Sequence, residues 1–132
     1  MARVSEKVVL SADIQRVWEL IASYRNYVSW RSDLKSVDGV TDNIFMETSK
    51  DNKRLMFYIT QKEPYSLLCF DMKNDVIQGH WTGKLSESDG KTVLEMTEEV
   101  YTKKLLLKPV LNRYLKKQQS LFIEDLKRAL GE

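Results

Sequence analysis

The sequence contains a single cysteine, Cys69, and a single histidine, His80, among its 132 residues. One cysteine cannot close a disulfide within the chain, so a reducing, cytoplasmic setting is expected. One cysteine and one histidine also cannot supply the nitrogen and sulfur ligands of a structural zinc site. We therefore expect neither a metal nor another cofactor.

Long apolar runs are absent as well. No stretch approaches the roughly 20 apolar residues needed to span a bilayer, and the first ten residues lack the apolar core of a signal peptide. The sequence also lacks the P-loop, GxGxxG, HExxH and GxSxG motifs, which argues against the nucleotide-binding, zinc-protease and serine-hydrolase classes. With 42% hydrophobic and 30% charged residues, the composition is typical of a globular protein, and we expect one domain over residues 1–132.

Acidic residues are missing from one basic stretch, residues 103–117. It contains six basic residues, whereas the rest of the chain has 15 basic and 19 acidic residues. One interpretation is a docking surface for an anionic membrane leaflet, in which Lys103, Lys104 and Lys108 surround Leu105–Leu107. The other is a solvated basic face with the leucines buried. Nucleic-acid binding is not favoured, because the aromatic residues do not alternate with the basic ones.

Period-two alternation predicts six strands in the middle of the chain and one at its start. Turn signals separate neighbouring segments by only a few residues, which favours antiparallel pairing. Between residues 43 and 63 both faces carry apolar residues, so alternation alone leaves the inward face open. The predicted strands span residues 3–11, 34–40, 43–50, 53–63, 65–74, 76–86 and 91–102.

Helical spacing appears at both ends of the sequence. After Ser11, a plausible N-cap, apolar residues recur on one face as far as Tyr24, and a second short helical turn follows near residues 27–30. A long helix is predicted over residues 109–130, with Pro109 in its first turn and Gly131 after its end. Two polar residues, Gln118 and Asp125, fall on the apolar face of this helix. We expect Asp125 to accept a hydrogen bond from the preceding short helices.

Three stretches resemble the START-like (SRPBCC) superfamily, and within it the polyketide cyclase/dehydrase and lipid-transport group. They are VVLSADIQRVWELIASYRNYVSWRSDLKSV (8–37), HWTGKLSESDGKTVLEMTEEV (80–100) and LFIEDLKRAL (121–130). The resemblance implies an α+β helix-grip fold: a curved, antiparallel, seven-stranded sheet around a long C-terminal helix, with two short helices after the first strand. Four aromatic residues would then close one end of the sheet as a plug: Trp18, Tyr24, Tyr27 and Trp30.

The helix-grip fold implies an internal cavity for a lipophilic ligand. Alternation places Glu98 among inward-facing apolar residues, where burial would raise its pKa; the alternative is a solvated Glu98, or one paired with a lysine. Cys69 and His80 alternate out of phase with their apolar neighbours and should point away from the cavity. The expected lining consists of Trp30, Phe70, Met72, Trp81, Leu94, Met96, Glu98, Leu111, Tyr114 and Gln118.

Two functions fit this lining. The first is intracellular binding of a lipophilic small molecule, such as a lipid, a polyketide or an isoprenoid-like compound. The alternative is a cyclase or dehydratase that uses the same pocket, with Glu98 as the candidate acid or base and Gln118, Tyr58 and Tyr101 as further polar groups. No complete catalytic constellation is evident in the sequence, so whether the protein is an enzyme stays open.

Overall fold

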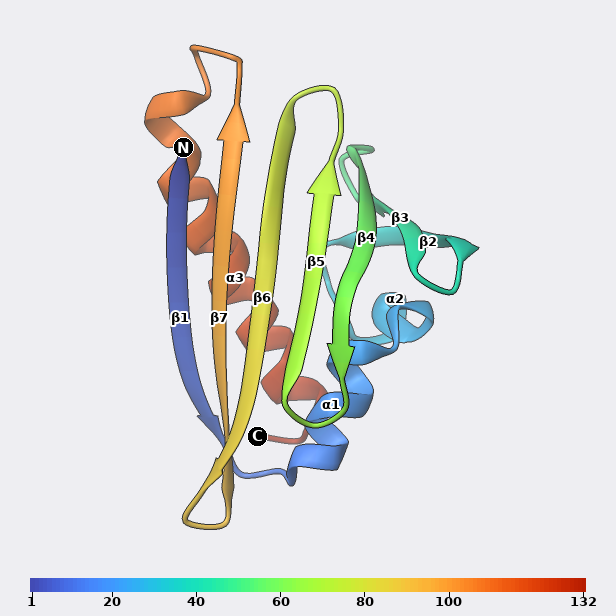
Figure 1. Ribbon diagram of the computed structural model, residues 1–132, viewed down its shortest axis with the longest axis vertical. Helices are drawn as coiled ribbons and strands as arrows, with labels where there is room; N and C mark the ends of the chain where they lie inside the picture. The colour runs from blue at the N-terminus through green and yellow to red at the C-terminus, as the bar shows by residue number, and fades with distance from the viewer.

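Seven antiparallel strands form one curved sheet in the order β1-β7-β6-β5-β4-β3-β2 (Figure 1). The computed structural model describes all 132 residues. It confirms the predicted α+β helix-grip architecture and every predicted strand. The strands are β1 (Ala2–Leu10), β2 (Leu34–Thr41), β3 (Ile44–Ser49), β4 (Arg54–Glu63), β5 (Leu67–Lys73), β6 (Ile77–Ser88) and β7 (Lys91–Thr102).

Two short helices follow β1, and a long helix ends the chain. The N-cap of the first helix is Asp13, whose carboxylate accepts a hydrogen bond from the Arg16 amide at 3.0 Å. The prediction of Ser11 was therefore wrong: its amide instead donates to the Glu132 carboxylate. No helix combines the length and the apolar character needed to cross a membrane. The helices are α1 (Ile14–Ala22), η1 (Tyr24–Asn26), α2 (Tyr27–Trp30), η2 (Lys108–Val110) and α3 (Leu111–Ala129).

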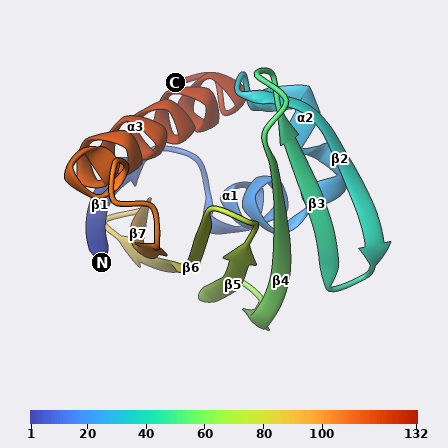
Figure 2. The same ribbon diagram turned by 90° about the horizontal axis from the view of Figure 1, so that it is seen from above.

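Helix α3 runs along the concave side of the sheet, and α1 and α2 lie at the end opposite η2 (Figures 1 and 2). Helix α3 packs on β1 along one edge of the sheet and on α2 near the other edge. The sheet curls so strongly that β2 and β3 rise beside α2 (Figure 2). The concave face between these two edges therefore looks toward α3.

The main core joins the short helices to the sheet and to the second half of α3. All four predicted plug aromatics are buried there, together with Leu126 of α3, which has no exposed surface. A smaller core cluster holds the first half of α3 against β1 and β7; it consists of Ala2, Val4, Val100, Leu111 and Leu115. The plug end of the molecule is thus more extensively packed than the end at η2.

Asp125 fastens α3 to the segment after α2, as predicted. Its buried carboxylate accepts hydrogen bonds from the amide and the hydroxyl of Ser32, at 2.7 and 2.9 Å. Gln119, which the sequence analysis did not single out, is the buried glutamine of α3, whereas Gln118 is only partly buried. Residue 119 lies on the side of α3 that faces β1, and its side-chain amide donates to the Val4 carbonyl at 3.3 Å.

Candidate functional site on the concave face

A row of directly paired residues crosses the concave face of the sheet. Val4 of β1 pairs with Glu98 of β7, Glu98 pairs with Trp81 of β6, Trp81 with Phe70 of β5, and Phe70 with Ile59 of β4. Directly paired residues on adjacent strands project on the same side of a sheet. Glu98 therefore stands in an otherwise apolar row that faces α3.

Aromatic rings continue this row onto the helices. The ring centroids of Phe70 and Trp81 lie 5.3 Å apart, those of Trp81 and Phe122 of α3 6.2 Å, and those of Phe122 and Trp30 of α2 5.4 Å. Trp30 is buried and its indole N–H has no hydrogen-bond partner. Trp81 and Phe122 are only partly buried, so solvent reaches the space between sheet and helix. We call Glu98 and these four aromatic residues the concave site.

A missing side chain at residue 83 makes room for the Trp81 ring. A Cβ placed on Gly83 would lie 2.5 Å from Trp81 Cη2 and 2.8 Å from Cζ3, closer than carbon atoms approach in proteins. Both residues point to the concave face of β6, two positions apart. The indole consequently lies over the backbone of its own strand and presents a ring face to the concave site.

Glu98 is the titratable group of this site. No hydrogen bond or ion pair to its carboxyl is present, which rules out the lysine-paired alternative. Burial, and to a smaller extent the nearby charge of Glu47, raise its pKa to about 7 against the opposing charge of Arg31. Near neutral pH this carboxyl exists in both protonation states and can either donate or accept a proton.

A partly buried arginine, Arg31, lies close enough to influence Glu98. Arg31 Nη1 donates to Glu47 Oε2 at 2.8 Å, and Nη2 donates to Asp33 Oδ2 at 2.9 Å. The Arg31 guanidinium also stacks over Phe122, at 5.6 Å from the ring centroid. We call Arg31, Asp33 and Glu47 the Arg31 cluster. Its two carboxylates and one guanidinium give it a net charge of −1.

Burial and the neighbouring charges act in opposite directions on the pKa values of Arg31 and Glu47. Burial acts to lower the pKa of Arg31, but the charges of Glu47 and Asp33 outweigh this and raise that pKa above its usual value. Burial also raises the pKa of Glu47, against the opposing charge of Arg31. The sequence prediction did not include this cluster, although Glu47 lies two residues from Phe45 and so shares its inward face.

Tyr114 and Gln118 are the predicted site residues of α3 that keep exposed surface. Tyr114 is 46% exposed. Burial raises the pKa of its phenol, Lys53 lowers it, and Asp51 and Glu98 raise it. The hydroxyl therefore lies within electrostatic range of both the β3–β4 turn and Glu98. Gln118 is partly buried and its side chain makes no hydrogen bond within the protein.

The remaining predicted lining residues belong to the packed core. Leu94 and Met96 have no exposed surface, and Met72 is also buried; all three lie in the main core. Leu111 lies in the smaller cluster on β1 and β7. These four residues are packed in the core, and the accessible predicted residues are Trp81, Glu98, Tyr114 and Gln118.

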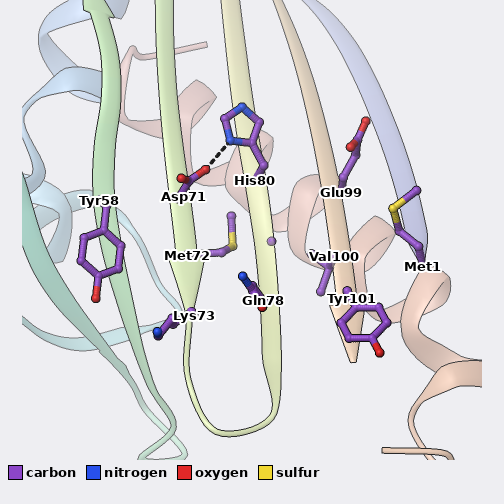
Figure 3. Close-up of a pocket in the computed structure, with 11 residues that line it drawn as sticks. Met1, Tyr58, Asp71, Met72, Lys73, Gln78, His80, Glu99, Val100 and Tyr101 are labelled. Atoms are coloured by element: carbon purple, nitrogen blue, oxygen red, sulfur yellow. Dashed lines mark hydrogen bonds and ion pairs between the residues drawn. The ribbon is translucent and has the colours of Figure 1, made fainter. Parts of the chain in front are cut away.

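The opposite, convex side of the sheet carries a separate hollow of about 420 Å³ (Figure 3). It is lined by Tyr58, Tyr101 and His80, and His80 Nδ1 lies 2.6 Å from Asp71 Oδ1. Cys69, on the same side, has its Sγ 3.9 Å from the Thr82 hydroxyl. His80 and Cys69 thus point away from the concave face as predicted. The convex position of Tyr58 and Tyr101 removes them as partners for Glu98.

A family comparison places the whole chain in one sequence family. The model described as "Polyketide cyclase / dehydrase and lipid transport" matches residues 1–131. No curated protein matches the sequence significantly.

Solved structures support the fold. A START superfamily protein from Mycobacterium smegmatis aligns with a TM-score of 0.87 at 10% identity, over 96% of this chain and 95% of its own. XoxI from Bacillus cereus aligns with a TM-score of 0.82 at 13% identity, over 98% and 95%. DynU16, a protein of the dynemicin biosynthetic locus, aligns with a TM-score of 0.78 at 18% identity, over 99% of this chain and 48% of its own. Identities this low establish the fold alone.

Proposed function

The chain belongs to the polyketide cyclase/dehydrase and lipid transport family, and from this premise we propose that it binds an uncharged lipophilic small molecule at the concave site. The observation that carries the proposal is the partly exposed pair Trp81 and Phe122 beside an unpaired, mostly buried carboxyl, Glu98. Small-molecule sites typically combine apolar walls with a few placed polar groups. The aromatic rings would hold the body of the ligand and Glu98 its polar end.

The charges around the site disfavour an anionic polar end. The Arg31 cluster has a net charge of −1, and Glu98 adds a second negative charge as the pH rises above about 7. A carboxylate ligand would be repelled in this poorly solvated environment. A hydroxyl or carbonyl group, in contrast, can accept a hydrogen bond from protonated Glu98 or, as a hydroxyl, donate one to the ionised form.

Three single-chain probes of equal length test the proposal: a fatty alcohol, a fatty amine and a fatty carboxylate. Each is titrated against a fluorescent apolar dye bound to the protein at pH 8. We expect the alcohol to displace the dye at least about tenfold more tightly than the carboxylate, a difference of about 1.4 kcal/mol. Native mass spectrometry of freshly purified protein, followed by extraction, identifies any ligand that the protein retains.

Two variants locate the bound probe. Trp81→Ala removes an accessible ring of the concave site and should weaken binding of the alcohol at least about tenfold. Tyr101→Ala removes an exposed ring on the convex side and should leave binding unchanged. Equal affinity for all three probes, or equal loss in both variants, would contradict the proposal.

A second function, acid–base catalysis of cyclisation or dehydration, is favoured by one observation. Glu98 has a pKa of about 7, near the optimum for a group that both takes up and releases a proton at neutral pH. If the protein turns over a linear poly-β-ketone thioester, Glu98→Gln should abolish turnover while preserving dye displacement by the fatty alcohol. Binding of the thioester without any turnover by the unaltered protein would exclude this second function for that substrate.

A further inference from the structure

We propose that residues 103–110, the connection between β7 and α3, dock the protein onto an anionic membrane surface. We call this segment the 103–110 tip. It contains Lys103, Lys104 and Lys108 together with Leu105 and Leu106. The proposal concerns a different surface from the concave site and holds whether or not that site binds a ligand.

Two adjacent leucines on the tip lie in solvent. Leu105 is 77% exposed and Leu106 is 91% exposed, and Val110 farther along the tip is also exposed. The alternative in which the leucines are buried where the strand meets the helix is therefore wrong for Leu105 and Leu106. A single exposed leucine is ordinary on a protein surface, but adjacent ones on a protruding segment are typical of an interaction site.

The chain holds the tip in a defined conformation. The hydroxyl of Thr102, a buried residue, donates to the Val76 carbonyl at 2.8 Å and accepts from the Lys104 amide at 3.2 Å. The Leu107 amide then donates to the Lys104 carbonyl at 3.1 Å, which closes a turn around Leu105 and Leu106. These bonds fix the start of the tip to the β5–β6 turn while the two leucine side chains project outward.

The positive charge on the tip is uncompensated. No acidic residue occurs between Tyr101 and Ile123, and none of the three tip lysines makes an ion pair. The lysines also precede the N-terminus of α3, where the helix dipole disfavours cations. This arrangement does not stabilise the isolated protein, but its charge is complementary to a layer of lipid phosphates.

The tip lies at the end of the molecule opposite α1, the end that also carries the β5–β6 and β3–β4 turns (Figure 1). Seen from that end, α3 and the sheet diverge between their contacts at β1 and α2 (Figure 2). Tyr114, on the α3 turn that follows the tip, is also exposed. Docking through the tip would turn this end of the molecule toward the bilayer.

The combination of side chains favours a bilayer over a nucleic acid. Phosphate groups of either partner could pair with the lysines, but only a bilayer offers apolar surroundings for Leu105 and Leu106. Each lysine near an anionic leaflet contributes about 1 kcal/mol to binding. Sites for single-stranded nucleic acids instead combine basic residues with exposed aromatic rings for stacking, and the tip itself has none.

Vesicle co-sedimentation tests the proposal with the full chain. Vesicles of phosphatidylcholine alone are compared with vesicles that also contain phosphatidylserine, at about 0.1 M and about 1 M salt, where the screening length falls from about 10 Å to about 3 Å. We expect binding to the anionic vesicles only, and mainly at the lower salt concentration. Leu105→Ser/Leu106→Ser and Lys103→Glu/Lys104→Glu/Lys108→Glu should each lower that binding at least about tenfold.

Matched controls make the same changes elsewhere. Val9→Ser/Val40→Ser alters two exposed apolar residues, and Lys62→Glu/Lys84→Glu/Lys91→Glu reverses three exposed lysines away from the tip; circular dichroism verifies that every variant is folded. Equal loss in the lysine control, or no binding of the unaltered protein to anionic vesicles, would overturn the proposal. So would equally tight binding to duplex DNA that depends on the lysines but not on the leucines.

Discussion

At the scale of single residues, Glu98 combines a poorly solvated carboxyl with the absence of any partner. Its pKa is about 7 in the folded protein and 4.5 for an ordinary glutamate. A raised pKa means that ionisation of Glu98 opposes folding. The contribution of Glu98 to stability is therefore most favourable below pH 4.5, decreases as the pH rises from 4.5 to about 7, and stays low above that range.

We accordingly expect Glu98→Gln to stabilise the protein at high pH. The free energy of unfolding should increase by up to about 3 kcal/mol at pH 8 and change little at pH 4.5. Urea denaturation at both pH values measures this difference. Glu95→Gln, at an exposed position of the same strand, serves as the control and should change stability by less than about 0.5 kcal/mol. If Glu98→Gln changes the free energy of unfolding equally at both pH values, the carboxyl of Glu98 is not in a poorly solvated environment.

Gly83 offers a second residue-scale test, because its missing Cβ accommodates Trp81. Gly83→Ala should force the indole to move and cost about 1–3 kcal/mol of stability, the range for overpacked sites. In a Trp81→Leu background the same change should cost less than about 0.5 kcal/mol, since no ring remains to be displaced. Denaturation of all four members of this double-mutant cycle gives the coupling. Additive effects would show that the close approach is unimportant.

The sequence predicted the position of Glu98 but not the residues that influence its charge. In β7 only one face is apolar, so alternation assigned Glu98 to the concave side. In β3 both faces carry apolar residues, and alternation could not show that Phe45 and Glu47 point inward. The pairing of Glu47 with Arg31 depends on the curl of the sheet beside α2, which no local pattern encodes.

At the scale of elements, the contact between Asp125 and Ser32 connects α3 to the end of α2. Asp125→Ala would remove the buried, charged acceptor of both Ser32 hydrogen bonds and should destabilise the protein by about 3 kcal/mol. Asp125→Asn keeps an acceptor oxygen and should cost about 1 kcal/mol. The neighbouring exposed residue supplies the control, because Glu124→Ala should cost less than about 0.5 kcal/mol. Thermal or urea unfolding distinguishes these three values, and equal losses for all three variants would argue against the contact.

The ends of helices and strands were predictable where turn residues or periodicity mark them. They were less predictable where contacts with distant residues determine the position of the end. Asp89 and Gly90 both have positive φ angles, of 52° and 75°, and their sequence correctly indicated the β6–β7 turn. Ser11 and Asp13 are both good N-cap residues, and the choice between them follows from Glu132, 121 residues away from Ser11. Similarly, Gln118 and Gln119 differ by one helical step, which the helical wheel could not resolve.

At the scale of the whole molecule, packing is uneven between the two ends. The second half of α3 joins the main core through Leu126, whereas the first half depends on the five-residue cluster that contains Leu111 and Leu115. Local opening occurs most readily where few apolar contacts hold an element. The first half of α3, which lies next to the 103–110 tip and carries Tyr114, is therefore the part of the helix that should open first.

Hydrogen exchange followed by mass spectrometry tests whether the first half of α3 opens more readily than the second half. We expect amides of residues 115–118 to exchange at least about tenfold faster than those of residues 122–126, which corresponds to a difference of about 1.4 kcal/mol in opening free energy. Leu115→Ala should accelerate exchange mainly in the first half of α3, whereas Leu126→Ala should cost about 2–5 kcal/mol and accelerate exchange throughout the protein. If a neutral lipophile occupies the concave site, it should slow exchange in the first half most, because that half has the most opening to suppress. Uniform exchange along α3, with or without the probe, would mean that the helix opens only with the whole domain.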